Sequence, residues 1–196
     1  SEEALNQLWI EFIKYRIIYD FEYWTYSFIF IKDKVSPKDI PFKLNRAQRR
    51  VLNKLEKLRK AGKPIKFILL KARQWGGSTL VQIYMLWIML VHRRNWNTVI
   101  CGDVETQSRN VRAMITKALN KYPSYLLGET VKFTPFEGSS KNKVIQNTNC
   151  VVSIGSFQKP DTLRSGDISG AHLTEIGLWR ATPGKKPEDL IQSISG

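Results

Sequence analysis

One segment limits the possible folds of this chain more than any other: a glycine turn between an apolar run and an apolar helix. Residues 65–70 read IKFILL, Gly76 and Gly77 follow, and a segment with helical periodicity begins at Ser78 and runs to Arg93. A short apolar run bounded by turn residues predicts a strand that is buried on both faces of a sheet. A strand, a glycine turn and a helix in this order have the layout of a phosphate-binding loop.

The chemistry of such a loop asks for inward-pointing backbone N–H groups, a helix N-terminus, a cation and a hydroxyl that holds Mg²⁺. Gly76, Gly77 and the helix that begins at Ser78 supply the first two, and Ser78 stands where the hydroxyl belongs. The lysine that usually precedes this hydroxyl is absent, so the cation would be Lys71 or Arg73. The pattern alone leaves two interpretations open, a phosphate loop with a displaced cation and an ordinary strand-to-helix turn.

The rest of the chain alternates between strand and helix patterns. This alternation predicts a three-layer α/β fold with a mainly parallel sheet. Residues 4–30 predict one or two packed helices whose aromatic side chains belong to the core, and residues 33–41 predict a linker. We expect further helices over 45–60, 78–93, 103–121 (capped by Asp103) and from Pro187 onward, and strands over 97–102, 131–134, 143–147, 150–156 and 170–174.

The charge of the chain indicates a polyanionic partner. It carries 31 Lys and Arg against 17 Asp and Glu, a net charge of +14, and residues 43–73 form a basic block opposed only by Glu56. Nucleic acid is the first expectation and an acidic membrane surface or protein the second, while a basic protein without such a partner stays open.

The cysteines and the hydropathy of the chain indicate the cellular compartment. Cys101 and Cys150 lie in apolar runs and predict buried free thiols. The acidic N-terminus lacks the pattern of a signal peptide, and the longest apolar run, residues 80–91, is too short for a membrane span. We therefore expect a soluble intracellular protein that does not engage a membrane.

The segment KARQWGGST, residues 71–79, resembles the ATPase domain of the terminase large subunit, the genome-packaging motor of tailed bacteriophages and herpesviruses. That family commonly carries a deviant loop, K-A-R-Q-x-G-x-S-T, in which the lysine opens the loop instead of closing it. The matching residues are Lys71, Ala72, Arg73, Gln74, Gly76, Ser78 and Thr79, with Trp75 and Gly77 at the variable positions.

Three further segments resemble motifs of the same family. In FKLNRAQRRVL, residues 42–52, Gln48 would hydrogen-bond adenine. In GAHLTEIGLW, residues 170–179, Glu175 would direct the attacking water, and Thr174 stands where an aspartate usually orders Mg²⁺ water, which puts the details of metal binding in doubt. In DTLRSGDISG, residues 161–170, Arg164 fits the position of an arginine finger. Taken singly, each has a plainer interpretation: a solvated helix residue for Gln48, a solvent-facing glutamate for Glu175, and a loop arginine that contacts DNA or a carboxylate for Arg164.

The resemblance implies a RecA-like P-loop ATPase core of the ASCE type over residues 41–196, behind a helical N-terminal region and linker over residues 1–40. It implies ATP and Mg²⁺ as cofactors, with Ser78 as the metal ligand and Thr174 in support. The implied nucleotide-binding set is Gln48, Lys71, Arg73, Gln74, Trp75, Gly76, Gly77, Ser78 and Thr79, and the implied catalytic set is Glu175 and Arg164.

The resemblance also implies a biological setting. The motor would drive double-stranded DNA into a procapsid in the host cytoplasm, as a homo-oligomeric ring together with a portal protein and a terminase small subunit. The family's coupling segment and nuclease domain are not reached before Gly196, so we expect a fragment that binds ATP weakly and hydrolyses it slowly. Two alternatives stay open: another nucleic-acid-dependent ATPase such as a helicase, and a non-catalytic basic DNA-binding module.

Overall fold

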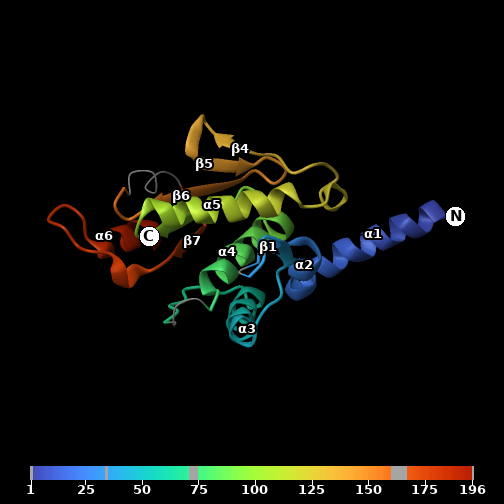
Figure 1. The fold of residues 1–196 in the computed structure, drawn as a ribbon, viewed down its shortest axis with the longest axis horizontal. Helices are drawn as coiled ribbons and strands as arrows, with labels where there is room; N and C mark the ends of the chain where they lie inside the picture. Colours follow the sequence, from blue (N-terminus) through green and yellow to red (C-terminus); the bar gives the residue numbers. More distant parts are fainter. Residues whose placement is uncertain (1, 34, 71–74, 160–166, 196) are drawn as a thin grey trace.

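The computed structural model describes residues 2–33, 35–70, 75–159 and 167–195, arranged as a mixed α/β fold (Figure 1). The helices are α1 (Glu2–Tyr19), α2 (Phe21–Phe28), α3 (Arg46–Lys60), α4 (Gly77–Trp87), α5 (Glu105–Asn120) and α6 (Pro187–Ser195), and α4 continues as a π-helical turn over Ile88–His92. The strands are β1 (Phe30–Lys32), β2 (Asp39–Pro41), β3 (Asn97–Gly102), β4 (Phe133–Phe136), β5 (Ser139–Ile145), β6 (Cys150–Ser156) and β7 (Gly170–Leu173).

The main sheet has the strand order β4-β5-β6-β3-β7. Its parallel part is a block of three adjacent strands in which β3 lies between β6 and β7, and Val99 is in register with Ser153 on one side and Ala171 on the other. β4 and β5 extend the sheet as antiparallel strands beyond β6. The carboxyl ends of β6, β3 and β7 therefore meet at one edge of the sheet.

Helices cover both faces of this sheet. Ile100 of β3 belongs to the larger core, together with residues of α4 and α5, whereas its neighbours Val99 and Cys101 pack in a second cluster with Leu190 and Ile194 of α6. Successive residues of a strand point to opposite faces, so these two clusters are the two sides of β3. The three-layer α/β arrangement expected from the sequence is present.

The N-terminal region shares the larger core with the rest of the chain. Trp24 is fully buried and donates an indole hydrogen bond to the hydroxyl of Tyr122, with 3.0 Å between Nε1 and Oη. Trp87 of α4 donates to the carbonyl of Ile17, with 2.8 Å between Nε1 and O. Residues 13–29 therefore pack on the α/β part as part of its hydrophobic core.

Part of the expected linker over residues 33–41 is a strand, since β2 covers residues 39–41, and the described residues between β1 and β2 belong to no helix or strand. β1 and β2 pair as a small antiparallel sheet in which Phe30 faces Pro41. Lys117 of α5 and Lys121, the C-cap residue of the same helix, both bind the carboxylate of Asp39, and these hydrogen bonds lower the pKa of Asp39 below its usual range. The segment over residues 33–41 is thus bound to α5 through Asp39.

The strand expected over residues 65–70 is absent. Residues 63–70 have no regular secondary structure, and the side chains of Ile68 and Leu70 are 99% exposed. An apolar run becomes a strand only where a neighbouring strand completes its hydrogen bonds, and among the described residues the sheet ends at β7. The sequence shows that this run is apolar, but it does not show whether a neighbouring strand is present.

Two smaller expectations also differ from the structure. Val104, and not Asp103, occupies the N-cap position of α5, without a side-chain capping bond. The aromatic residues of the N-terminal helices do not all lie in the core, because Trp9, Phe12 and Tyr15 of α1 are each about half exposed or more.

Other expectations are confirmed. Helix α3 and strands β3, β6 and β7 lie where the sequence predicted them. Both cysteines are free and buried. In the part of the chain that the structure describes, no helix combines the length and the hydropathy needed to cross a membrane.

The Trp24–Tyr122 hydrogen bond gives a test of the shared core. Tyr122→Phe removes the acceptor and leaves the buried indole N–H of Trp24 unpaired, which we expect to lower the free energy of unfolding by about 1–3 kcal/mol. Tyr26→Phe is the matched control, because Tyr26 is 58% exposed. Urea titration of both variants measures the difference, and equal stability of the two would contradict a shared core.

Candidate functional site at the glycine turn

The glycine turn forms the start of α4. Gly76 is the N-cap in the left-handed conformation, with φ 82° and ψ 21°, and Gly77 is the first residue of the helix. Glycine adopts this conformation without the steric penalty of a side chain. The first N–H groups of α4 have no partner within their own helix, so this turn has the backbone geometry of an anion site. Lys71, Arg73 and Gln74 lie outside the described residues.

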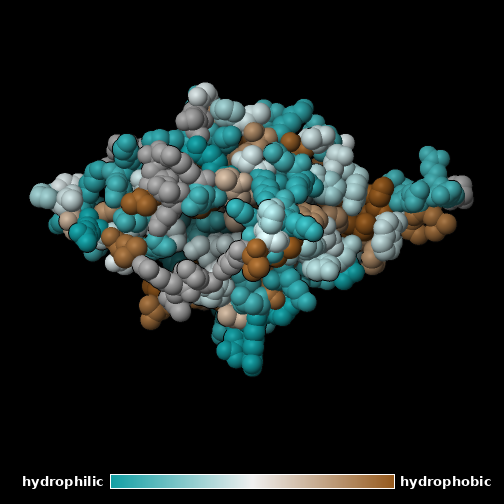
Figure 2. Space-filling model, viewed as in Figure 1, coloured by the Kyte–Doolittle hydropathy of each residue, from teal (hydrophilic) through white to brown (hydrophobic). Residues whose placement is uncertain are grey.

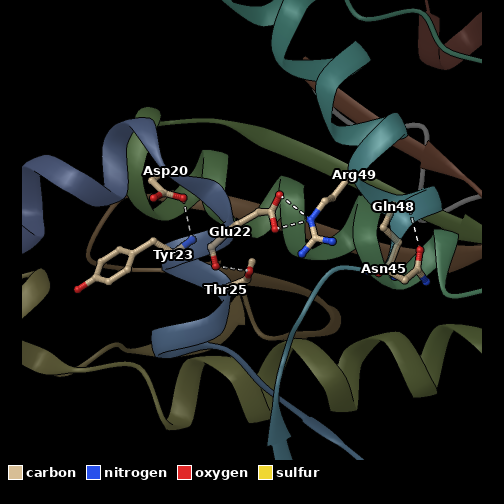
Figure 3. A network of polar contacts seen from close by, with 7 residues as sticks. All are labelled: Asp20, Glu22, Tyr23, Thr25, Asn45, Gln48 and Arg49. Atoms are coloured by element: carbon tan, nitrogen blue, oxygen red, sulfur yellow. Dashed lines mark hydrogen bonds and ion pairs between the residues drawn. The ribbon is translucent and has the colours of Figure 1, made fainter.

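Gln48 holds the turn from the neighbouring helix. A capping box opens α3: Gln48 N–H donates to Asn45 Oδ1 and Asn45 N–H donates to Gln48 Oε1, each over 2.9 Å (Figure 3). From this position Gln48 Nε2 donates to the carbonyl of Gly76 over 3.0 Å, and Asn45 Nδ2 donates to the carbonyl of Trp75 over 3.1 Å. The same two side chains therefore cap α3 and hold the turn in front of α4.

The contact leaves no room for a side chain at position 76. A Cβ placed on Gly76 would lie 2.7 Å from Gln48 Nε2. Gln48 is itself only 4% exposed, so its amide has little space to withdraw. Glycine at position 76 is required by both the backbone conformation and the close approach of Gln48.

A second contact joins the start of α4 to the end of β7. Ser78 Oγ and Thr174 Oγ1 are 3.2 Å apart, although 96 residues separate them along the chain. Thr174 is buried, and its N–H donates to the carbonyl of Cys101, which keeps it in line with the sheet. The hydroxyl predicted to hold Mg²⁺ and the residue predicted to support it are thus direct neighbours.

Glu175 follows Thr174 and leaves the sheet. It is exposed and has φ 58° and ψ 35°, a left-handed conformation that is uncommon for residues other than glycine. Such strained residues concentrate at functional sites. Glu175 lies at the carboxyl edge of the parallel strands, where open α/β sheets bind their ligands.

The oxygen donors fit the predicted metal. Magnesium prefers hard oxygen ligands and keeps several waters, so one serine hydroxyl together with substrate phosphates is an ordinary donor set. Among the described residues there is no cluster of three His, Cys, Asp or Glu side chains that would hold a metal without a phosphate ligand. If Mg²⁺ binds here, Ser78 would be its protein ligand, and Thr174 would brace that hydroxyl without adding charge.

A cavity that the sequence did not predict lies among the residues that follow three parallel strands. It measures about 780 Å³ and is lined by residues that follow β3, β6 and β7, among them Asp103, Phe157, Gly177, Arg180 and Lys185. The ring of Phe157 stacks on Trp179 with 4.9 Å between centroids. In the sequence, the signal for this cavity is the pair of cations Arg180 and Lys185, which follow Glu175 within ten residues. Arg164, the expected arginine finger, lies outside the described residues.

Comparison with known proteins supports the fold. Neither a protein-family model nor a curated protein sequence matches the chain. Among solved structures, the chain is similar to the large terminase of bacteriophage HK97, with a TM-score of 0.66 and 20% sequence identity over 93% of this chain. The chain spans 34% of the length of that protein. The resemblance inferred from the motifs is therefore found again in the three-dimensional fold.

The glycine turn gives a test with a matched control. Gly76→Ala carries the left-handed strain of roughly 1–2 kcal/mol and, in addition, the overlap with Gln48. Gly62→Ala carries the strain alone, since Gly62 has φ 65° and nothing lies within 4 Å of its added Cβ. We expect Gly76→Ala to be the less stable variant by at least about 1 kcal/mol in urea titrations.

A double-mutant cycle then assigns that difference. Gln48→Ala removes the overlapping amide, so it should destabilise the Gly76→Ala protein less than it destabilises the wild type, with a coupling on the order of 1 kcal/mol. Additive effects would show that Gln48 does not hold the turn.

Proposed function

We propose that this chain is the ATPase motor domain of a terminase large subunit, which couples ATP hydrolysis to the translocation of double-stranded DNA into a viral procapsid. The observation that carries the proposal is the contact between Ser78 and Thr174. It joins the start of α4 to Thr174, the residue before Glu175, and phosphoryl transfer requires a phosphate cradle and a water-directing group next to one another. The shared fold with the HK97 large terminase supports the same assignment.

Each residue has a proposed role in this reaction. Lys71 and Arg73 clamp the phosphates, the backbone N–H groups of residues 74–78 cradle them, and Glu175 orients the water that attacks the γ-phosphate. Ser78 would hold Mg²⁺, which would supply positive charge to the phosphates. Arg164 supplies a guanidinium as the γ-phosphate leaves.

Gln48 has a double role in this proposal. Its amide holds Gly76, and a primary amide carries a second N–H and a second lone pair, which suit the donor and acceptor pattern of an adenine edge. Because Gln48 is buried, contact with adenine requires its side chain to shift. Binding of the base would then act directly on the carbonyl that shapes the glycine turn.

The nucleotide assignment has a direct test. In the Mg²⁺-dependent binding of a fluorescent ATP analogue, we expect Lys71→Ala to weaken binding because it removes a phosphate cation. Glu175→Gln should retain binding but lower the rate of phosphate release by a factor on the order of 10²–10⁴, the usual contribution of a positioned base. Chelation of Mg²⁺ with EDTA should abolish turnover.

Glu137→Gln is the matched control for Glu175→Gln, since Glu137 is also an exposed glutamate with positive φ, at 48°, in the turn between β4 and β5. The residue 1–196 chain should show slow turnover, and the longer protein on procapsids should show fast turnover. If neither Lys71→Ala nor Glu175→Gln changed binding or hydrolysis, the chain would be better explained as a basic DNA-binding module. Duplex unwinding without packaging would favour a helicase.

Basic residues of α3 form the proposed contact with DNA. Four of them recur at three- and four-residue spacing on one exposed face, and they make no ion pair with another described residue: Arg46, Arg50, Lys54 and Lys57. Figure 2 shows a hydrophilic surface over the region where Figure 1 places α3. Two other cations of the predicted basic block are paired: Arg49 binds Glu22 of α2, and Arg59 binds Glu56 (Figure 3 shows the former).

The proposed partners of the complete motor are double-stranded DNA, a portal protein, a terminase small subunit and further copies of the same chain in a ring, acting in the host cytoplasm. Among these partners, the DNA requires sequence-independent attraction to its phosphates, which the exposed face of α3 would supply.

Salt dependence tests the DNA contact. A protein that neutralises phosphates releases counterions, so its affinity falls linearly in a plot of log K against log salt concentration. Arg50→Ala/Lys54→Ala should weaken binding to all sequences alike and reduce the slope of that plot by about 2. Lys14→Ala, in the exposed ion pair with Glu11 on α1, is the control that should leave the slope unchanged. An unchanged slope in the double variant would remove α3 from the DNA surface.

A further inference from the structure

Helix α1 has two apolar faces, and only one of them is covered. Ile13 and Ile17 are buried against the core, and Ile10 and Ile18 lie half-buried beside them. The other face is an exposed stripe whose members recur at three- and four-residue intervals and therefore lie on one side of the helix. This stripe, called the α1 stripe below, consists of Leu5, Leu8, Trp9, Phe12, Tyr15 and Tyr19, whose exposed fractions run from 49% to 68%.

The α1 stripe projects into solvent. Every residue from 2 to 9 is exposed, and Figure 1 shows the N-terminal half of α1 extending away from the body of the molecule. Figure 2 shows hydrophobic side chains gathered at the same projecting end. Trp9 and Phe12 stack on each other with 5.6 Å between centroids, so part of the stripe already forms an aromatic surface.

The exposed apolar area of the α1 stripe is large enough to indicate a binding partner. Aromatic side chains carry roughly 150–250 Å² each, so four of them that are half to two thirds exposed, with two leucines, present on the order of 600 Å². This is the upper end of what a monomeric protein leaves open to water. Two such surfaces pressed together would bury on the order of 1,200 Å², the lower end of the range for specific interfaces.

The charges of α1 favour a protein, rather than a membrane or a nucleic acid, as the binding partner of the α1 stripe. The helix carries Glu2, Glu3 and Glu11 against Lys14 and Arg16, so it has a net charge of −1 in a chain whose net charge is +14. Helices that lie on anionic membranes have a polar face rich in Lys and Arg, and nucleic acid requires the same. An acidic helix suits neither of them.

The order of these charges also makes the α1 stripe complementary to itself. Acidic side chains occupy the first turn of α1, and Arg16, which pairs with Asp20 and lies over the ring of Tyr23 in its own chain, occupies the last turn. In an antiparallel pair that sets Trp9 of one copy against Phe12 of the other, Arg16 of one copy faces position 5 of the other, one helical turn from Glu2. A two-fold pair of this kind uses the same patch on both subunits. The two basic bodies would then lie at opposite ends of the pair, where their mutual repulsion is weakest.

We propose that the α1 stripe is a dimerisation surface through which two copies of this chain pair by antiparallel contact of their α1 helices. The proposal is independent of the nucleotide site, since α1 contributes no residue to the glycine turn. The pair also differs from a head-to-tail ring, because a two-fold contact closes after two subunits.

Sedimentation equilibrium of the residue 1–196 chain over a range of concentrations tests the pairing. We expect the average mass of the wild type to rise from one chain toward two. Trp9→Ser/Phe12→Ser should raise the dissociation constant by a factor on the order of 100, because two central aromatic contacts are lost. Tyr26→Ser, at an exposed aromatic residue of α2 outside the stripe, should dimerise like the wild type.

Cysteine cross-linking tests the antiparallel register, because both native cysteines are buried. Leu5→Cys/Arg16→Cys should form a covalent dimer under mild oxidation, and Leu5→Cys alone should not. A wild type that stays monomeric throughout, or a Trp9→Ser/Phe12→Ser protein that pairs as strongly as the wild type, would overturn the proposal. Efficient cross-linking of Leu5→Cys alone would indicate a parallel pair and would overturn the register. Circular dichroism of each variant confirms that α1 is intact.

Discussion

The carbonyl of Gly76 is the acceptor on which the candidate site depends. It receives the first hydrogen bond of α4, from Leu80 N–H over 3.0 Å, and the amide of Gln48 over 3.0 Å. One oxygen therefore sets both the start of α4 and its position relative to α3. A carbonyl has two lone pairs, so both donors are accommodated without competition.

The contacts that extend from this carbonyl connect three parts of the chain. The Asn45–Gln48 capping box orients the amide, and the same Asn45 also reaches Trp75. At the other end of the turn, Ser78 meets Thr174, which is aligned by the parallel pairing of β7 with β3. The site is thus built from a helix cap, a left-handed glycine and a strand end, each supported by ordinary secondary structure. In the proposed function, adenine binding at Gln48 would change the conformation of the glycine turn that binds the phosphates.

Much of this could be predicted from the sequence. Asn45 followed three residues later by Gln48 is a local capping pattern, and Gly76-Gly77 before an apolar helix is a local turn pattern. The alternation of buried strands and helices indicated the three layers. In contrast, the run over 65–70 looked like a buried strand but has no neighbour among the described strands, and Trp9 and Phe12 looked like core but face solvent. Both errors have one cause, since hydrophobicity records that a side chain prefers burial but not whether a surface is present to bury it.

Local features follow from the sequence alone: the glycine turn, the helix after it, and the oxygens and cations that are available for phosphate chemistry. These depend on backbone sterics and on hydrogen bonds between residues a few positions apart. The packing of the whole chain is needed to bring Gln48 against Gly76, to join Ser78 to Thr174 across 96 residues, and to leave one apolar face of α1 uncovered. Those outcomes depend on how the parallel strands stack in space, and strand order is a property of the whole packed core rather than of any one segment.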